Sequence, residues 1–203
     1  TGLRIGSIYG RGIGGWPGQE DVDLAHKLRL LDIATETGAG LIVFGGTPKS
    51  RGGSLDSVVT VLHHLAPPAA ERGVRISLEN HAKFTIETIE DYAAIFDGVR
   101  HENVGICIDT GHFDAADVDM MELIERFADR VNHLHVKENR GKGSVDFRRF
   151  GEGTTDNAAV IEKLIENDYS GFITVEISPP KDRPNEVEDL RKPLEMFGMY
   201  CGE

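Results

Sequence analysis

The sequence predicts an α/β fold of the (β/α)8 barrel type, with six of the strands visible in this chain. Short apolar runs alternate with longer amphipathic runs, which implies parallel strands joined by crossover helices. The last four strand candidates place aliphatic residues on one face and mostly small or polar residues on the other. A doubly wound sheet would bury aliphatic residues on both faces, so this pattern favours a barrel. No linker or change of composition interrupts the sequence, and we therefore expect a single domain over residues 1–203.

The strand candidates are short runs rich in apolar and β-branched residues. They cover residues 3–8, 41–44, 75–79, 104–109, 131–136 and 172–177. Alternate residues of a strand point to the same face, so an acid or histidine near a strand end shares its face with the residue two positions before it. The matched pairs are Ser77 with Glu79, Cys107 with Asp109, His133 with His135, and Thr174 with Glu176.

The helix candidates lie between these strands and have apolar residues at helical spacing. They cover residues 21–37, 55–72, 88–96, 118–129, 157–166 and 186–200. Gly38 stands where a C-terminal cap is expected, and Thr88 with Asp91 resembles a capping box. The consecutive prolines Pro67 and Pro68 predict a break or kink in the second helix.

The overall composition is that of a soluble globular protein, with 39% hydrophobic and 28% charged residues. A formal net charge of −12 opposes binding to nucleic acid, and no dense run of Lys and Arg offsets it. No stretch is long and apolar enough to predict a membrane span. Cys107 and Cys201 are far apart and show no metal-site spacing, so we expect a cytoplasmic protein.

Four polar residues stand at the ends of successive strand candidates, each separated from the next by about one βα unit: Glu79, Asp109, His135 and Glu176. In a (β/α)8 barrel the C-terminal ends of the strands form the active site. Neighbouring strands are about 4.8 Å apart, so these side chains can converge on one ion. Three carboxylates and one imidazole suit a divalent metal, and we expect Mn²⁺, with Mg²⁺, Co²⁺ and Zn²⁺ as alternatives.

The segments around these residues resemble the xylose isomerase-like sugar phosphate isomerase/epimerase superfamily. The matching motifs are Leu78-Glu79-Asn80-His81, Ile108-Asp109-Thr110-Gly111-His112, His133-Leu134-His135-Val136-Lys137-Glu138, Gly151-Glu152-Gly153 and Val175-Glu176-Ile177. The resemblance covers nearly the whole chain and implies a TIM barrel with a Glu-Asp-His-Glu divalent metal site. It is specific for the superfamily and says little about the substrate.

The resemblance implies an isomerase or epimerase of carbohydrate metabolism that acts on a sugar or sugar phosphate. Such an enzyme removes a proton beside a carbonyl, and the metal stabilises the resulting enediolate. By resemblance to the epimerases, Glu79 and Glu176 would transfer the proton as well as bind the metal. Asp109 and His135 would then act as ligands only.

Further residues near the strand ends are candidates for substrate binding. By resemblance, His112 would hydrogen-bond a substrate or metal-bound oxygen. Glu138 and Arg140 follow the histidine ligand and suit hydroxyl, carboxylate or phosphate groups. His81 is either a supporting partner of Glu79 or a residue at a helix entry, and Trp16 would wall the pocket.

Three alternative functions remain open from the residues. A dehydratase acting on a cyclitol or keto-sugar needs the same proton abstraction and the same metal site. An abasic-site endonuclease shares the barrel but needs more histidines and a less acidic surface. A non-catalytic subunit is the third alternative.

Aligned on its motifs, the chain begins at the third strand of the family. An open sheet of this kind would expose two edges. We therefore expect either an upstream segment or another chain beside it, and a homo-oligomer is one such arrangement.

Overall fold

The structure is a computed structural model that describes residues 4–177 and 187–201. Contacts divide the chain into two compact units, Thr1–Cys107 and Ile108–Glu203. Strand β4 (Val104–Asp109) contributes residues to both units. The prediction of a single domain stays a prediction, and the two units are described in turn.

The first unit contains a parallel sheet in which the C-terminal ends of neighbouring strands lie at the same level. Its order is β1 (Ile8–Gly12), β2 (Leu41–Gly45), β3 (Arg75–Glu79) and the first part of β4. The register pairs Gly45 with Glu79 and Glu79 with Cys107. The C-terminal ends of β2 and β3 therefore lie level with Cys107 of β4.

The first strand lies later in the sequence than we predicted. Residues 3–8 were expected to form it, but the structure places β1 at Ile8–Gly12, and Leu3 lies outside the described residues. A Cβ atom at Gly10 would collide with the ring of Phe44 on β2. Glycines lower strand propensity, which is why the segment was not predicted as a strand. They also allow it to approach and pair closely with β2.

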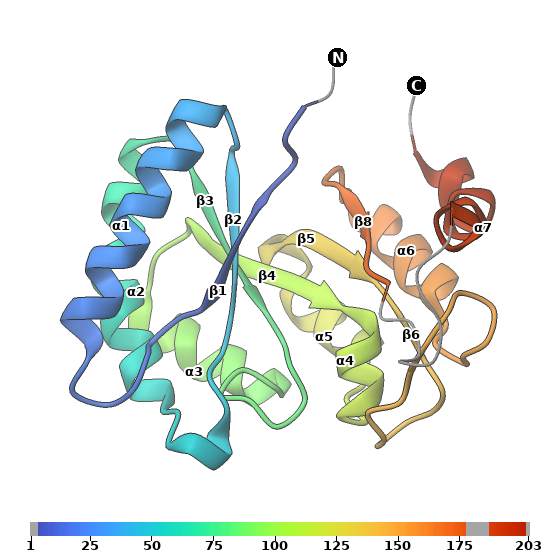
Figure 1. Cartoon of the computed structure of the whole chain (residues 1–203), viewed down its shortest axis with the longest axis horizontal. Coiled ribbons are helices and arrows are strands. Elements are labelled where there is room, and N and C mark those ends of the chain that lie inside the picture. The colour runs from blue at the N-terminus through green and yellow to red at the C-terminus, as the bar shows by residue number, and fades with distance from the viewer. Residues whose placement is uncertain (1–3, 178–186, 202–203) are drawn as a thin grey trace. The chain divides into compact units, whose positions relative to one another are not determined.

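Three helices cover one side of the sheet in the first unit (Figure 1). They are α1 (Glu20–Thr37), α2 (Leu55–Glu71) and α3 (Ile89–Val99), and each packs on the next. Gly38 caps α1 in the left-handed conformation, and Thr88 forms the predicted capping box with Asp91. Helices on one side only are typical of a barrel rather than of a doubly wound sheet. A short 3-10 helix, η1 (Lys49–Arg51), precedes α2.

The expected break at Pro67 and Pro68 is wrong, because α2 continues through both prolines to Glu71. The prolines lie near the end of the helix. The two carbonyl groups that they leave without a helical donor belong to His63 and His64, which are exposed, so water can satisfy them. The loss of two backbone hydrogen bonds is therefore tolerated there.

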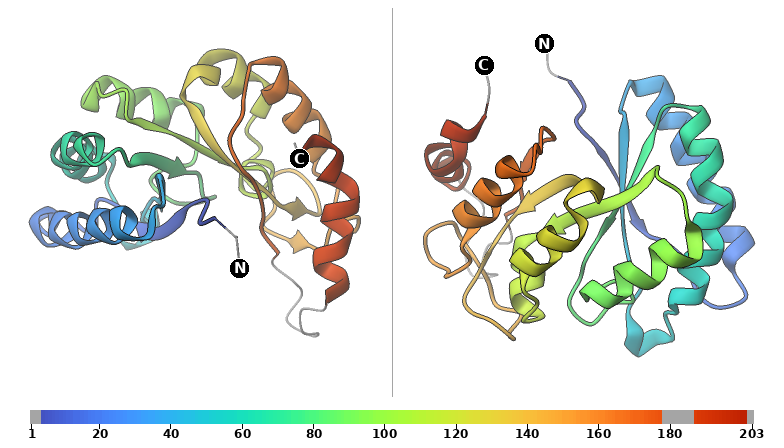
Figure 2. Two further views of the ribbon diagram at one scale, coloured as in Figure 1. Left: turned by 90° about the horizontal axis from the view of Figure 1, so that it is seen from above. Right: turned by 180° about the vertical axis from the view of Figure 1, so that it is seen from behind.

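The second unit continues from β4 through β5 (Val131–Val136) to β8 (Ile173–Val175), in the order β4-β5-β8. Its helices are α4 (Thr110–Ala115), α5 (Met120–Phe127), α6 (Asn157–Glu166) and α7 (Val187–Phe197) (Figure 2). Two 3-10 helices, η2 (Ala128–Arg130) and η3 (Gly198–Tyr200), follow α5 and α7. Helix α6 has the predicted bounds, whereas α4 was not predicted.

A small antiparallel hairpin follows β5 and was also not predicted. It consists of β6 (Glu138–Asn139) and β7 (Phe147–Arg148). The side chain of Asn139 fastens its loop by donating to the carbonyl oxygens of Gly141 at 2.7 Å and Ser144 at 2.9 Å. Its Oδ1 atom accepts a hydrogen bond from Asp146 N at 3.0 Å.

Helix α7 contacts the rest of the second unit through an ion pair and a ring contact. The buried guanidinium of Arg149 pairs with Asp189, and the ring of Phe150 packs edge-on against Phe197 at 5.6 Å. The predicted helix began at Glu186, which lies outside the described residues. Within the described part of the chain, no helix is both long and apolar enough to cross a bilayer.

Candidate metal centre

Three of the four predicted metal ligands converge in the second unit. Asp109 is the last residue of β4, His135 lies one residue before the end of β5, and Glu176 directly follows β8. Glu176 N donates to Val136 O at 3.0 Å, which extends the pairing of β8 with β5. One ligand atom from each of the three side chains lies within 4.8 Å of the others.

On β5 and β8, each predicted ligand shares a face of the strand with the residue two positions before it, as the sequence predicted. His133 is buried, and its Nε2 atom lies 3.1 Å from Thr174 Oγ1. The rings of His133 and His135 pack edge-on at 4.9 Å. Because His133 and Thr174 each precede a predicted ligand by two residues, this contact fixes the face on which His135 and Glu176 lie.

A histidine and a lysine lie against the carboxylate of Glu176. Its Oε2 atom lies 3.5 Å from His135 Nδ1, and its Oε1 atom forms an ion pair with Lys137 Nζ. Burial alone would raise the pKa of Glu176, but the hydrogen bond from His135 and the charge of Lys137 hold this pKa well below its ordinary value. The carboxylate is therefore ionised at neutral pH and able to bind a cation.

Lys137 and Phe147, which were not among the predicted site residues, lie beside the predicted ligands. Lys137 is only 2% exposed, and its Nζ atom lies 3.6 Å from Asp109 Oδ2. The ring of Phe147 on β7 lies 4.4 Å from the same Nζ atom. The alternation of β5 indicated that Lys137 shares a face with His135, but no sequence signal placed Phe147 here.

Asp109 also caps the helix that follows it. Its Oδ1 atom accepts a hydrogen bond from His112 N at 2.8 Å, which makes Asp109 the N-cap of α4. The imidazole of His112 then packs edge-on against Phe147 at 4.6 Å. The cap therefore holds His112, a predicted substrate-binding residue, close to Asp109.

A buried hydroxyl joins the start of α4 to the end of β5. Thr110 Oγ1 accepts from Lys137 N at 2.9 Å and lies 2.6 Å from Asn157 Oδ1, to which it donates. Asn157 is the first residue of α6. Thr110 thus fixes the backbone of Lys137 relative to two helices.

We predict that Thr110→Val lowers the free energy of unfolding by about 1–3 kcal/mol, because it leaves buried polar groups without a partner. Valine keeps the shape of threonine, so packing changes little. Chemical denaturation measures the effect. Thr60→Val is the matched control, since the hydroxyl of Thr60 is exposed and bonds only to Asp56 O of its own helix. An equal effect in the two variants would contradict the prediction.

The structure places Glu138 and Arg140 differently from each other. Glu138 is buried, and its carboxylate accepts from Gly153 N at 2.9 Å and Asn157 Nδ2 at 3.2 Å. Burial raises the pKa of Glu138, and these hydrogen bonds partly oppose the rise. Arg140 is exposed and pairs with Asp146 at 3.4 Å within the hairpin. Glu138 is therefore held within the loop framework, whereas the guanidinium of Arg140 remains open to solvent.

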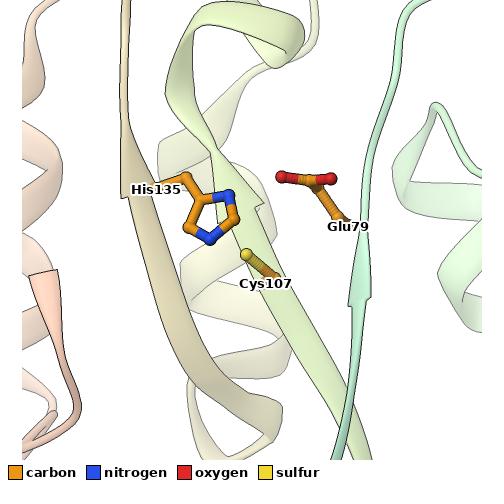
Figure 3. A group of neighbouring side chains, drawn as sticks. All are labelled: Glu79, Cys107 and His135. Atoms are coloured by element: carbon orange, nitrogen blue, oxygen red, sulfur yellow. The ribbon is translucent and has the colours of Figure 1, made fainter. Parts of the chain in front are cut away.

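The first unit positions Glu79 at the end of β3, next to Cys107 (Figure 3). Glu79 is 1% exposed, and its Oε2 atom lies 3.3 Å from His81 Nε2. The contact that a supporting role for His81 requires is therefore present. Cys107 is buried and is not part of a disulfide. Trp16 lies half-buried in the loop between β1 and α1, where its carbonyl oxygen accepts from Gln19 N.

The donor set of the second unit fits a divalent cation. Asp109 and His135 are buried, and Glu176 joins them within 4.8 Å. The ammonium group of Lys137 offers these carboxylates one positive charge, and a bound cation would add to it. Oxygen and imidazole donors are those that Mn²⁺, Zn²⁺ and related ions accept. This convergence is the feature of the site on which a metal-dependent function depends.

Comparison with known families agrees with this geometry. The family model described as the xylose isomerase-like TIM barrel matches residues 4–197. The chain belongs to this family. The fold class expected from the sequence, an α/β fold of the TIM-barrel type, is thereby confirmed.

Several known proteins are similar to the chain. An inosose dehydratase of Lactiplantibacillus plantarum is 30% identical over 162 residues, which cover 72% of this chain and 54% of that protein. The crystal structure of the 3-keto-D-glucoside 4-epimerase from E. coli superposes with a TM-score of 0.79 at 24% identity, covering 99% of this chain and 81% of that one.

A third relative is a structure of the IOLI protein with a bound zinc atom. It superposes with a TM-score of 0.78 at 21% identity, covering 97% of this chain and 77% of that chain. At this level of identity the likeness concerns the fold. The chain spans about half the length of the curated xylose isomerase-like relatives that it matches.

Proposed function

We propose that this chain carries the active site of a divalent-metal-dependent enzyme that removes a proton beside the carbonyl of a polyhydroxylated ketone. The observation that carries the proposal is the convergence of Asp109, His135 and Glu176 within 4.8 Å at the ends of neighbouring strands. The ionised state of Glu176 supports it, since a proton acceptor must be ionised.

We propose Glu79 as the fourth ligand. It is buried at the end of β3, and the strand register places it beside Cys107, two residues before Asp109 on the same face of β4. With Glu79, the set has three carboxylates and one imidazole, which suits Mn²⁺ and also Mg²⁺, Co²⁺ or Zn²⁺. The zinc atom in the IOLI protein supports a dication in this fold.

A dication bound by these residues supplies the positive charge that stabilises negative charge developing on the substrate oxygens. In the proposed reaction Glu79 and Glu176 hold and move the proton. His112, packed on Phe147, is placed to hydrogen-bond a substrate hydroxyl. His81 would orient Glu79. Arg140, which is exposed, and Trp16, which is half-buried, are proposed as further contacts with the substrate.

Dehydration of a cyclitol ketone is the outcome that we favour, because the inosose dehydratase is 30% identical to the chain. In that reaction a carboxylate takes the proton from the carbon beside the carbonyl, which leaves an enolate. The electron pair of the enolate then forms the carbon–carbon double bond as the hydroxyl group on the next carbon accepts a proton and leaves as water. Epimerisation of a keto-sugar is the second candidate, because the epimerase shares the fold over 99% of this chain.

Exchange of the substrate proton in D₂O tests the step that both reactions share. We expect the metal-loaded protein to incorporate deuterium beside the carbonyl of an inosose or of a ketohexose, and we expect chelation to stop the exchange. Nuclear magnetic resonance of the products then separates the outcomes: loss of water supports the dehydratase, and an inverted stereocentre supports the epimerase. Absence of exchange with every polyhydroxylated ketone tested would refute the proposal.

A further inference from the structure

A buried lysine side chain lies among the proposed metal ligands of the second unit. The Nζ atom of Lys137 forms an ion pair with Glu176 and lies 3.6 Å from Asp109 Oδ2. The side chain is 3% exposed. Its ammonium group therefore interacts with the same carboxylates that the proposed function assigns to the metal.

The fold holds this side chain in place at several points. Thr110 Oγ1 accepts from the backbone N–H of Lys137 at 2.9 Å. A Cβ atom at Gly111 would lie 2.9 Å from Lys137 Cγ and 3.0 Å from its Cβ, so the glycine makes room for the aliphatic stem. The ring of Phe147 lies 4.4 Å from the ammonium group, a favourable cation–π distance. The position of the ammonium group is thus built into the fold.

We propose that Lys137 is a positioning residue that shares Asp109 and Glu176 with the metal, competes with it for their oxygens and so weakens metal binding. The inference rests on the proposed function, because it concerns the same carboxylates. Competition follows from the contacts, since a dication that takes an oxygen of Glu176 must displace or repel the ammonium group.

The test compares the affinity for Mn²⁺ of the wild-type chain with that of its variants. Each affinity is measured on the full chain by titration calorimetry after all metal has been removed. We expect Lys137→Met to bind Mn²⁺ at least about tenfold more tightly than wild type, because a positive charge beside the dication is removed. Lys137→Gln, which is neutral but polar, is expected to change affinity in the same direction and replaces the methionine variant if that variant does not fold. Lys142→Met is the control, because Lys142 is exposed and pairs only loosely with Asp117 at 4.0 Å.

The direction of the change separates competition from a structural role. A lysine that only supports the fold would weaken metal binding when it is replaced, whereas competition predicts tighter binding. Equal or weaker affinity in the neutral variants, with Mn²⁺ bound by wild type, would overturn the inference and leave the proposed metal site intact. Absence of Mn²⁺ binding in wild type and both variants would overturn the proposed function together with it.

Discussion

Replacement of Glu176 by glutamine is expected to abolish turnover while the fold persists. The amide keeps the size of the side chain but can neither accept the substrate proton nor supply a negative charge. A lost acid/base group lowers kcat by about 10²–10⁴-fold. The side chain of Glu176 is 38% exposed, and its buried ion-pair partner, Lys137, keeps a second carboxylate, Asp109, at 3.6 Å. Steady-state kinetics with the substrate identified by deuterium exchange, together with a melting curve, measure the two expectations.

Glu166→Gln is the matched control for this variant. Glu166 is the last residue of α6 and pairs with Lys163 at 3.9 Å on the surface, where such pairs contribute little. We expect its turnover and melting temperature to match those of wild type. Wild-type turnover in Glu176→Gln would refute the role assigned to Glu176.

Two substitutions of Asp109 are expected to separate its proposed metal-binding role from its capping role. Oδ1 caps α4 through His112 N, and Oδ2 lies beside Lys137. Asparagine is as good an N-cap as aspartate but carries no charge. We therefore expect Asp109→Asn to lose at least about 100-fold in affinity for Mn²⁺, while α4 stays capped.

Asp109→Ala is expected to lose the same metal affinity and, in addition, about 0.5–2 kcal/mol of folding free energy, because the cap is removed. Titration calorimetry measures the first effect and denaturant unfolding without metal measures the second. Undiminished Mn²⁺ affinity in Asp109→Asn would remove Asp109 from the proposed ligand set. Equal stability of the two variants would show that the cap contributes nothing measurable.

The sequence was sufficient to predict the strand ends that form the candidate site. Strand alternation is a local property, and it placed Asp109, His135 and Glu176 correctly because each follows a short, strongly apolar run. The caps at Gly38 and Thr88 were predictable for the same reason, since a cap depends on residues within one turn.

The features that were missed depend on contacts between residues distant in sequence. The pairing of β1 relies on a close approach between Gly10 and Phe44, which glycine-rich composition alone does not indicate. Phe147 reaches the site only because the hairpin of β6 and β7 folds back, and each of its strands is too short to give a periodic pattern. Lysine side chains are mostly exposed, so the sequence does not indicate that Lys137 is buried. Its burial is explained by the two neighbouring carboxylates, which are distant in sequence.

In the hairpin that carries Phe147, the side chain of Asn139 forms hydrogen bonds with three backbone groups of the loop. Helix α4 also holds the tip between Arg140 and Asp146, because Gly143 N donates to Asp114 O at 3.0 Å. The backbone of the tip is thus fixed by bonds that do not involve the exposed side chains of Arg140 and Lys142. Substitution of these side chains is therefore expected to leave the hairpin, and with it the position of Phe147, unchanged.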